Sequence, residues 1–178
     1  MSETYPAGIK DLYLSSSYGA KLLATLPIFK GFSPEELGRV YSLGDIRLFH
    51  TNVTVVVELE NSSGLYAVLE GTVGVFKAGG PNHAGHRITS LGVGKSFGEM
   101  SLIDKKPRSA TVVAETNVTL FYLDGAVWDQ VLSDDVRTAT RFYRNCSVNL
   151  AERLRRLDAE FILGQKQLWR AALEKKIS

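Results

Sequence analysis

The chain has 178 residues, which is enough for one core-forming domain with a helical appendage but hardly for two full domains. With 44% hydrophobic and 22% charged residues it has the composition of an ordinary globular protein, and no apolar run approaches the roughly 18 residues of a membrane-spanning helix. The net charge of +2 is uneven, because residues 1–136 carry 11 Lys/Arg against 15 Asp/Glu whereas residues 137–178 carry 10 against 4. We interpret the basic C-terminal part as a solvated helix face rather than a surface for nucleic acid or membrane.

Cysteine and histidine usage argues against several kinds of site. The single Cys146 excludes an intramolecular disulfide, a redox pair and a zinc site built on several cysteines, which fits a reducing compartment. His83 and His86 have no third ligand nearby, so we predict no metal site and no metal cofactor. The start of the chain lacks the apolar stretch of a signal peptide, and we therefore expect a cytoplasmic protein with no membrane span.

Residues 19–43 have the pattern of helices. In FSPEELGRV, Ser33 is placed as an N-cap, Pro34 stands at the first helical position and Glu36 can close a capping box, so a helix is predicted to begin there. From residue 46 to residue 124, short β-branched and aromatic runs alternate with Gly, Asn and Ser clusters, with a Gly-Thr turn at 71–72. Strands at this spacing without helices between them predict an antiparallel barrel or sandwich.

The pattern becomes helical again after Asp124. Apolar residues then follow the alternating spacing of four and three that is typical of a helix seam: Leu150, Leu154, Leu157, Phe161, Gly164, Leu168 and Ala171. The partner of such a seam is either the chain's own barrel or the same helix of a second chain. The length of the seam, which exceeds the width of one barrel, favours the second chain, so we predict a homodimer through residues 140–172.

The predicted fold is therefore α+β, an antiparallel, jelly-roll-like β-barrel flanked by N-terminal helices and a long C-terminal helix. We predict three divisions of the chain. They are an N-terminal segment (1–18), a barrel domain with its N-terminal helices (19–132) and a C-terminal helical segment (133–178).

The stretch GVGKSFGEM, residues 92–100, contains the Gly-Lys-Ser that ends a nucleoside-triphosphate loop. Such a loop also needs a Gly five positions before Gly94, where this chain has Thr89, and a long helix behind it. Pro107 and a further β-run follow within about a dozen residues, so a unit of strand, loop and long helix has no room. The sequence thus argues against a triphosphate hydrolase.

The same stretch can still bind a phosphate. Gly98 allows close approach of the backbone to a ligand, and Met100 to Ile103 can form one helical turn with free N–H groups. Arg108 follows with a guanidinium able to grip two phosphate oxygens, and Glu99 can accept a hydrogen bond from a sugar hydroxyl. One Glu, one Arg and no metal-binding acid indicate a compact nucleotide monophosphate. The alternative is that Glu99 and Arg108 merely pair with each other.

These residues carry a resemblance. FGEMSL (97–102) followed by PRSAT (107–111) resembles the phosphate-binding cassette of the cyclic-nucleotide-binding domain family. LLATLPIFKGFSPEEL and GLYAVLEGTVGVF resemble the family's N-terminal helices and central hairpin, so the resemblance covers about residues 20–160. Asn52 stands where the family commonly has Gly, but Asn tolerates positive φ better than other residues with a side chain.

The resemblance implies a role for each cassette residue. Glu99 would accept from the ribose 2′-hydroxyl, Arg108 would bind the exocyclic oxygens of the cyclic phosphate, and Ser109 would add a hydroxyl to the phosphate site. Gly98 would let the backbone approach the ligand closely. Backbone N–H groups of the phosphate site would come from Met100, Ser101 and Ala110. Strand positions that match the base-lining positions of the family, and that are equally explained as strand core, are Val75, Ile88, Thr89 and Leu91. Alignment by Arg108 and Trp128 places three residues of the C-terminal helix near the base: Asn149, Arg153 and Leu154.

By this resemblance the chain is expected to be a non-enzymatic receptor whose C-terminal helix closes as a lid over the bound base. Arg-Ser-Ala at residues 108–110 looks closer to the bacterial cyclic AMP (cAMP) regulators than to cyclic GMP (cGMP) binders, so cAMP is preferred and cGMP is the alternative. No helix-turn-helix module follows the long helix, so we expect an unidentified protein partner and no direct DNA binding. The alternative function is a dimeric interaction scaffold whose pocket is vestigial or takes another phosphorylated metabolite.

Overall fold

The N-terminal helices form where the sequence predicts them. The computed structural model describes residues 16–78 and 85–177, without the side chains of residues 16–18, 168 and 171–177. Its first elements are α2 (Ser16–Ala24), the 3-10 helix η1 (Pro27–Phe29) and α3 (Pro34–Leu43). Ser33 Oγ accepts from the Glu36 backbone N–H at 3.1 Å, and Glu36 Oε2 accepts from the Ser33 N–H at 2.6 Å. This capping box confirms the predicted start of α3.

The described strands form two antiparallel sheets. One has the order β1 (Asp45–Phe49), β8 (Val118–Asp124), β3 (Gly64–Glu70) and β6 (Ser96–Phe97). The other has the order β2 (Thr54–Val56), β7 (Thr111–Ala114), β4 (Val73–Lys77) and β5 (His86–Leu91). Apolar side chains of both sheets meet in one core, among them Val68 and Leu120 from the first sheet and Val73 and Val112 from the second. The α+β, jelly-roll-like fold is thus confirmed, although the two sheets do not close into a barrel.

Two tight turns need residues that accept positive φ. Asn52 has φ 67°, and its N–H donates to the Ala114 carbonyl at 2.7 Å. Gly71 has φ 77° between β3 and β4, where a Cβ would collide with the Asn117 carbonyl. The Asn at position 52 therefore adopts the left-handed conformation expected of it.

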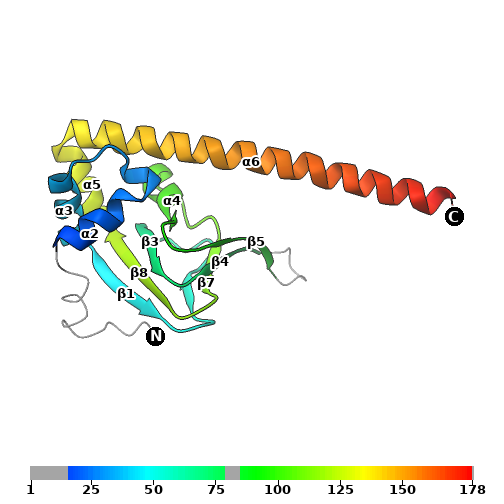
Figure 1. Cartoon of the computed structure of the whole chain (residues 1–178), viewed down its shortest axis with the longest axis horizontal. Coiled ribbons are helices and arrows are strands. Elements are labelled where there is room, and N and C mark those ends of the chain that lie inside the picture. Colours follow the sequence, from blue (N-terminus) through cyan, green and yellow to red (C-terminus); the bar gives the residue numbers. More distant parts are fainter. Residues whose placement is uncertain (1–15, 79–84, 178) are drawn as a thin grey trace.

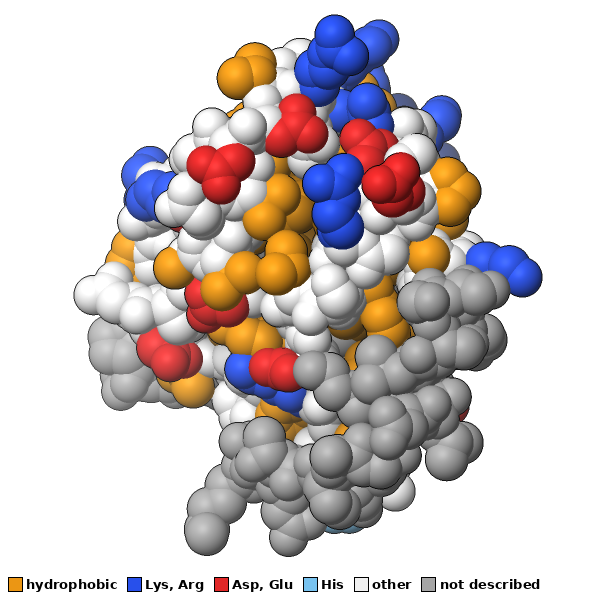
Figure 2. All heavy atoms as spheres, turned by 90° about the vertical axis from the view of Figure 1, so that its left-hand side faces the viewer, with side chains coloured by type: hydrophobic (Ala, Val, Ile, Leu, Met, Phe, Trp, Pro, Cys, Tyr) orange, Lys and Arg blue, Asp and Glu red, His pale blue; other side chains and the backbone are white. Residues whose placement is uncertain are grey.

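The helices pack together at one end of the sheets (Figure 1). α5 (Gly125–Asp134) begins directly after β8, and Asp124 caps it by accepting from two N–H groups of its first turn at 2.9 and 3.2 Å. Trp128 packs edge-on against Phe29 of η1 and Phe142 of the following helix, with ring centroids 6.0 and 5.2 Å apart. On the surface of this end, acidic and basic side chains are interspersed with small apolar areas (Figure 2).

The last helix, α6 (Val136–Ile177), runs along the sheets and projects well beyond them (Figure 1). Two anchors hold its first part. Arg141 Nη1 lies 2.7 Å from Glu36 Oε2, and Asn145 Nδ2 donates to backbone carbonyls of η1 and its C-cap at 3.1 and 2.8 Å. Of the helices in the described ranges, none combines the length and the apolar character needed to cross a bilayer. The predicted boundary after residue 132 falls in the last turn of α5, and the division into three parts stays a prediction.

The predicted seam of α6 has two environments. Leu154 and Leu157, 60% and 48% exposed, line a cavity against the chain's own sheets, whereas Phe161, 67% exposed, does not. The side chains of Leu168 and Ala171 lie outside the described residues. The seam thus faces the protein's own sheets up to residue 157, which leaves chiefly its later part for a second chain. The homodimer stays a prediction.

Candidate functional site

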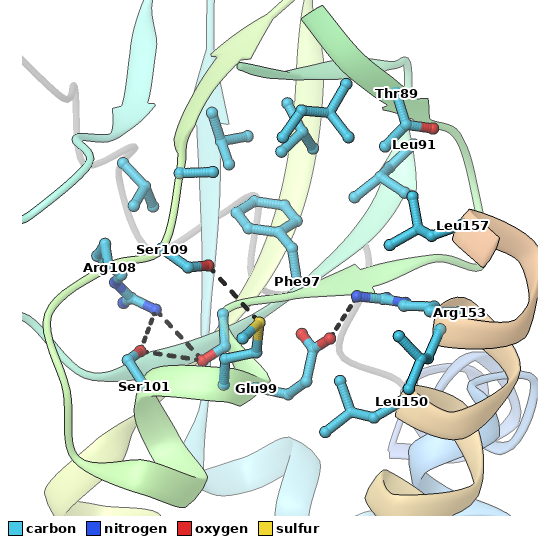
Figure 3. Close-up of a pocket in the computed structure, with 18 of the residues that line it drawn as sticks. Thr89, Leu91, Phe97, Glu99, Ser101, Arg108, Ser109, Leu150, Arg153 and Leu157 are labelled. Atoms are coloured by element: carbon cyan, nitrogen blue, oxygen red, sulfur yellow. Dashed lines mark hydrogen bonds and ion pairs between the residues drawn. The ribbon is translucent and has the colours of Figure 1, made fainter. Parts of the chain in front are cut away.

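A cavity of about 470 Å³ lies between the two sheets and α6 (Figure 3). The sheets contribute apolar side chains and one threonine: Val56, Val75, Ile88, Thr89, Leu91, Phe97 and Val112. The segment around α4 (Glu99–Asp104) contributes the polar part: Gly98, Glu99, Met100, Ser101, Arg108, Ser109 and Ala110. The helix α6 closes the remaining side with Leu150, Arg153, Leu154, Arg156, Leu157 and Glu160.

Arg108 is a buried cation at the edge of this cavity. Only 3% of its surface is exposed; Nε donates to Ser62 Oγ at 3.0 Å, and Nη1 donates to the Gly64 carbonyl and to Ser101 Oγ, both at 2.9 Å. Burial lowers the pKa of this guanidinium, but an arginine stays protonated in a protein. Within residues 16–78 and 85–177, no carboxylate lies within ion-pair distance of it and no hydrogen bond is made by Nη2. The site therefore offers an anion one positive charge with an unused donor.

Glu99 is paired with α6 rather than with Arg108. The residue is 1% exposed, and its Oε1 accepts from Arg153 Nη1 at 2.5 Å. Arg153 Nη2 donates in turn to the Ser96 carbonyl of β6 at 2.9 Å. The structure thus does not form the Glu99–Arg108 salt bridge that was the alternative interpretation, and α6 supplies the counter-charge of Glu99 (Figure 3).

The backbone between β6 and α4 brings the polar groups together. Gly98 has φ 89°, and a Cβ at this position would collide with the Gly64 carbonyl and with the Arg108 guanidinium. Because α4 begins directly after it, the first N–H groups of α4 have no acceptor within the helix. Ser109 Oγ lies 3.6 Å from Met100 Sδ, and the exposed Met100 side chain borders the cavity.

The aromatic side chains of the first sheet form a stack behind the cavity. Phe97 lies parallel to Tyr66 with ring centroids 4.9 Å apart, and Tyr66 packs on Tyr122 at 4.8 Å. The Arg47 guanidinium lies 3.4 Å from the centre of the Tyr122 ring, and that of Arg108 lies 5.8 Å from the Tyr66 ring. Burial raises the pKa of Tyr122 to about 12, so its hydroxyl is neutral at physiological pH. Of these three rings, only Phe97 lines the cavity, and the two tyrosines support it from behind.

Metal binding finds no support in the same region. Residues 16–78 and 85–177 contain no group of three His, Cys, Asp or Glu side chains that could hold a metal ion. His86 is the first residue of β5, whereas His83 lies outside the described residues.

Known proteins are similar in sequence to the part of the chain that forms the sheets and α4. Residues 46–135 match the family model of the cyclic nucleotide-binding domain. The chain belongs to the cyclic-nucleotide-binding domain family. The Cyclic AMP receptor protein of Thermus thermophilus is 32% identical to it over 139 residues, which are 77% of this chain and 61% of that protein.

Two further proteins are similar to this chain. Glutaminase 1 of Bradyrhizobium diazoefficiens is 28% identical over 132 residues, which are 74% of this chain and 21% of that protein. The crystal structure of a cyclic nucleotide-binding domain from Methylobacillus flagellatus aligns with a TM-score of 0.69 and 26% identity, covering 82% of this chain and 80% of that one. The chain therefore spans less than two thirds of the length of each of these two curated relatives.

The family's cassette positions converge on the cavity. The predicted ligand-binding residues all line it: Gly98, Glu99, Met100, Ser101, Arg108, Ser109 and Ala110. Most predicted base-lining residues do so too: Val75, Ile88, Thr89, Leu91, Arg153 and Leu154. Asn149 does not, and Leu150 lines the cavity in its place, because neighbouring residues point about 100° apart around a helix.

Sequence reasoning misses several lining residues: Val56, Phe97, Val112, Leu150, Arg156, Leu157 and Glu160. The three strand residues have the alternation of ordinary sheet core, which gives no sign of a ligand. The α6 residues carry a usable signal, because Arg153 interrupts an otherwise apolar stripe between Leu150, Leu154 and Leu157. A cation in such a stripe indicates a buried carboxylate opposite, which is Glu99 here.

Proposed function

We propose that the chain is a non-enzymatic receptor for a cyclic nucleotide, with cAMP as the preferred ligand and cGMP as the alternative. The observation that carries the proposal is Arg108, a 3% exposed cation with no carboxylate of the described residues within ion-pair distance, although Glu60 and Glu99 act on it from further away. A buried charge without a direct ion-pair partner is costly, at up to several kcal/mol per ion. A cyclic phosphate supplies one negative charge and two free oxygens, which a guanidinium can bind together.

The rest of the cavity suits a nucleotide better than free phosphate. Glu99 has a second carboxylate oxygen, Oε2, that makes no hydrogen bond with the described residues and can accept from a ribose 2′-hydroxyl. Ser109 Oγ and the N–H groups of Met100, Ser101 and Ala110 are the further donors we propose for the phosphate. A base would lie between the apolar strand residues and α6.

The proposed preference for adenine is argued from the name of one relative and from the side chain of Ser109. The 32% identical relative is named for cyclic AMP, which supports adenine as the preferred base. Ser109 Oγ can bond either the phosphate or the 2-amino group of guanine, so it does not exclude cGMP. Hydrogen bonds from α6 to the base would set the preference, and one or two of them are worth about ten to a hundredfold in affinity.

Titration calorimetry of the whole chain with four ligands tests the proposal: cAMP, cGMP, 5′-AMP and inorganic phosphate. We expect cAMP to bind most tightly, cGMP more weakly, and inorganic phosphate not measurably. If neither cyclic nucleotide binds at millimolar concentration, the receptor proposal is wrong. The alternative function, a dimeric interaction scaffold with a vestigial pocket, is then supported instead. Equal binding of 5′-AMP and cAMP would instead support a receptor for other phosphorylated metabolites.

We further propose that α6 transmits the signal. Its projecting part carries exposed aromatic side chains, Phe161 at 67% and Trp169 at 68%, which a second copy of the helix would cover in a homodimer. Ligand capture would then reposition the segment 133–178 toward a protein partner. Direct binding to DNA is not part of this proposal.

A further inference from the structure

A lysine outside the cavity bonds the backbone of the cassette. Lys77, the last residue of β4, does not line the cavity, but its Nζ donates to the Ser109 carbonyl at 2.7 Å. The same Nζ lies 2.5 Å from Glu58 Oε1, and Glu58 Oε2 accepts from the Ala78 N–H at 2.7 Å. Hydrogen bonds from Lys77 and Ala78 lower the pKa of Glu58, so this carboxylate is charged at neutral pH. Lys77 therefore joins the end of β4, the segment between β2 and β3, and the cassette.

The backbone just before Ser109 is also bonded to the segment between β2 and β3. The Arg108 N–H donates to the Glu60 carbonyl at 3.0 Å, and the Arg108 carbonyl accepts from the Leu59 N–H at 2.9 Å. Both backbone groups of Arg108 are thus engaged. The contact with Lys77 adds a hold on the next peptide unit, which joins Ser109 to Ala110.

We infer that Lys77 is a positioning residue for the phosphate: by holding the Ser109 carbonyl from outside the cavity, it turns the Ala110 N–H toward the ligand. This inference rests on the proposed function, in which that N–H is one of the phosphate donors. The carbonyl and the N–H belong to one planar peptide unit, and in a trans peptide they point in opposite directions. Lys77 lies at the carbonyl end of this unit, whereas Ser109 and Ala110 line the cavity.

The charges agree with this orientation. An ammonium at the carbonyl and an anion at the N–H lie at opposite ends of the peptide dipole, and hydrogen bonds linked in this way strengthen each other. Arg108 supplies the counter-charge of the phosphate, whereas Lys77 makes a neutral backbone group a better donor. Loss of Lys77 should therefore weaken the binding of cAMP without abolishing it.

Titration calorimetry of the full chain with cAMP measures this effect. Lys77→Met, which removes the donor but keeps an unbranched side chain, should weaken binding about three- to tenfold, the size of one hydrogen bond. Because the Lys77 side chain is 53% exposed, this variant should remain folded. Lys77→Arg, which retains a cation able to bond both acceptors, should bind within about twofold of the wild type.

Arg87→Met is the matched control. It also removes the cation of a surface ion pair, from the neighbouring strand β5, and Arg87 does not line the cavity. Its affinity for cAMP should equal that of the wild type.

The amide resonance of Ala110 separates positioning from simple attraction between charges. In chains selectively labelled with heavy nitrogen at alanine, saturating cAMP should move the Ala110 amide proton downfield, because an N–H bonded to a phosphate oxygen makes a charge-assisted hydrogen bond. Ala110→Gly identifies the resonance by removing it. The downfield movement should be smaller in Lys77→Met and unchanged in Arg87→Met. The same spectra show whether each variant is folded.

The outcomes are distinguishable. A wild type that binds no cAMP removes the proposed function and the inference together. A wild type that binds cAMP, with Lys77→Met within about twofold of it, leaves that function intact and overturns the inference. A weakened Lys77→Met in which the Ala110 proton still moves as in the wild type also overturns it, because Lys77 would then act through its charge alone.

Discussion

Replacing Arg108 by alanine tests the proposed phosphate site most directly. In a complex, its guanidinium would face the ligand's negative charge in a site where the residue is only 3% exposed. Truncating one member of such a buried, hydrogen-bonded charge pair costs roughly 2–5 kcal/mol, which is about 30-fold to several thousand-fold in the dissociation constant for cAMP. The range is wide because Nη1 is already shared among protein acceptors, so that Nη2 has to provide much of the bonding.

The same substitution should leave the chain folded. It removes hydrogen bonds to Ser62, Gly64 and Ser101, which favours the unfolded chain, but it also removes a desolvated cation, which favours the folded one. These two effects oppose each other, and we expect the free energy of unfolding without ligand to change by less than about 2 kcal/mol. Urea unfolding of both proteins measures this.

Calorimetric titration with cAMP is the decisive assay, and Arg87→Ala is its matched control. The substitution Arg87→Ala also removes one positive charge. Arg87, however, pairs with Glu115 at 2.7 Å on the surface and does not line the cavity. The control should bind cAMP as the wild type does. If Arg108→Ala binds within about threefold of the wild type while remaining folded, the assignment of Arg108 to the phosphate is wrong.

Four further predictions have defined outcomes, and the first of them has a control substitution. Phe161→Asp should turn the proposed dimer into a monomer, whereas Val148→Asp, at a position that is 53% exposed on the far side of α6, should not. Sedimentation velocity distinguishes monomer from dimer, and a wild type that is monomeric at micromolar concentration contradicts the dimer. Ser109→Ala should weaken cAMP binding by about 1 kcal/mol, and a cGMP preference of the wild type that disappears in this variant would reverse the base assignment. Asp124→Ala should lower the free energy of unfolding by about 1 kcal/mol, because α5 loses its N-cap; an unchanged urea midpoint would refute this. Burial alone would raise the pKa of Glu36, but hydrogen bonds from the α3 cap and from an arginine of α6 lower it. The carboxylate therefore stabilises the fold at any pH above its pKa in the unfolded chain, and this stabilisation is lost as the pH falls through its pKa in the folded protein. Glu36→Gln should therefore be less stable at neutral pH by about 1 kcal/mol, and in thermal unfolding the difference should close as the pH falls through the lowered pKa of Glu36.

The features that could be predicted from the sequence have local causes. The capping box at Ser33, the positive φ at Asn52 and the close backbone approach at Gly98 each depend on a few consecutive residues. The strands are similarly marked by β-branched runs between turn residues. Because the cassette from residue 97 to residue 111 is one short stretch of chain, its side chains reach the same cavity once the strands are in place.

The contacts of α6 could not be predicted in the same way, because they join residues that are 54 to 117 positions apart in the sequence. Periodicity places Leu154 and Leu157 on one face of the helix but does not say whether that face meets another chain or the protein's own sheets. An error of one residue in alignment turns a side chain by about 100°, which separates Asn149 from Leu150. The partner of Arg153 depends on the same rotation, so the sequence predicts a position near the base but not the ion pair with Glu99.

The geometry of α6 gives a physical reason to expect ligand and partner to influence each other. The helix has 42 residues and is therefore about 63 Å long, and the anchors formed by its described side chains lie in its first half, whereas the rest projects beyond the sheets. A continuous helix is stiff, so a small rotation about the anchors at Arg141 and Asn145 displaces the part beyond Phe161 by a larger distance. The residues that face the cavity belong to the same stripe as those left exposed beyond it. If a second chain binds the exposed part and the ligand strengthens that association, the association must strengthen ligand binding by the same free energy.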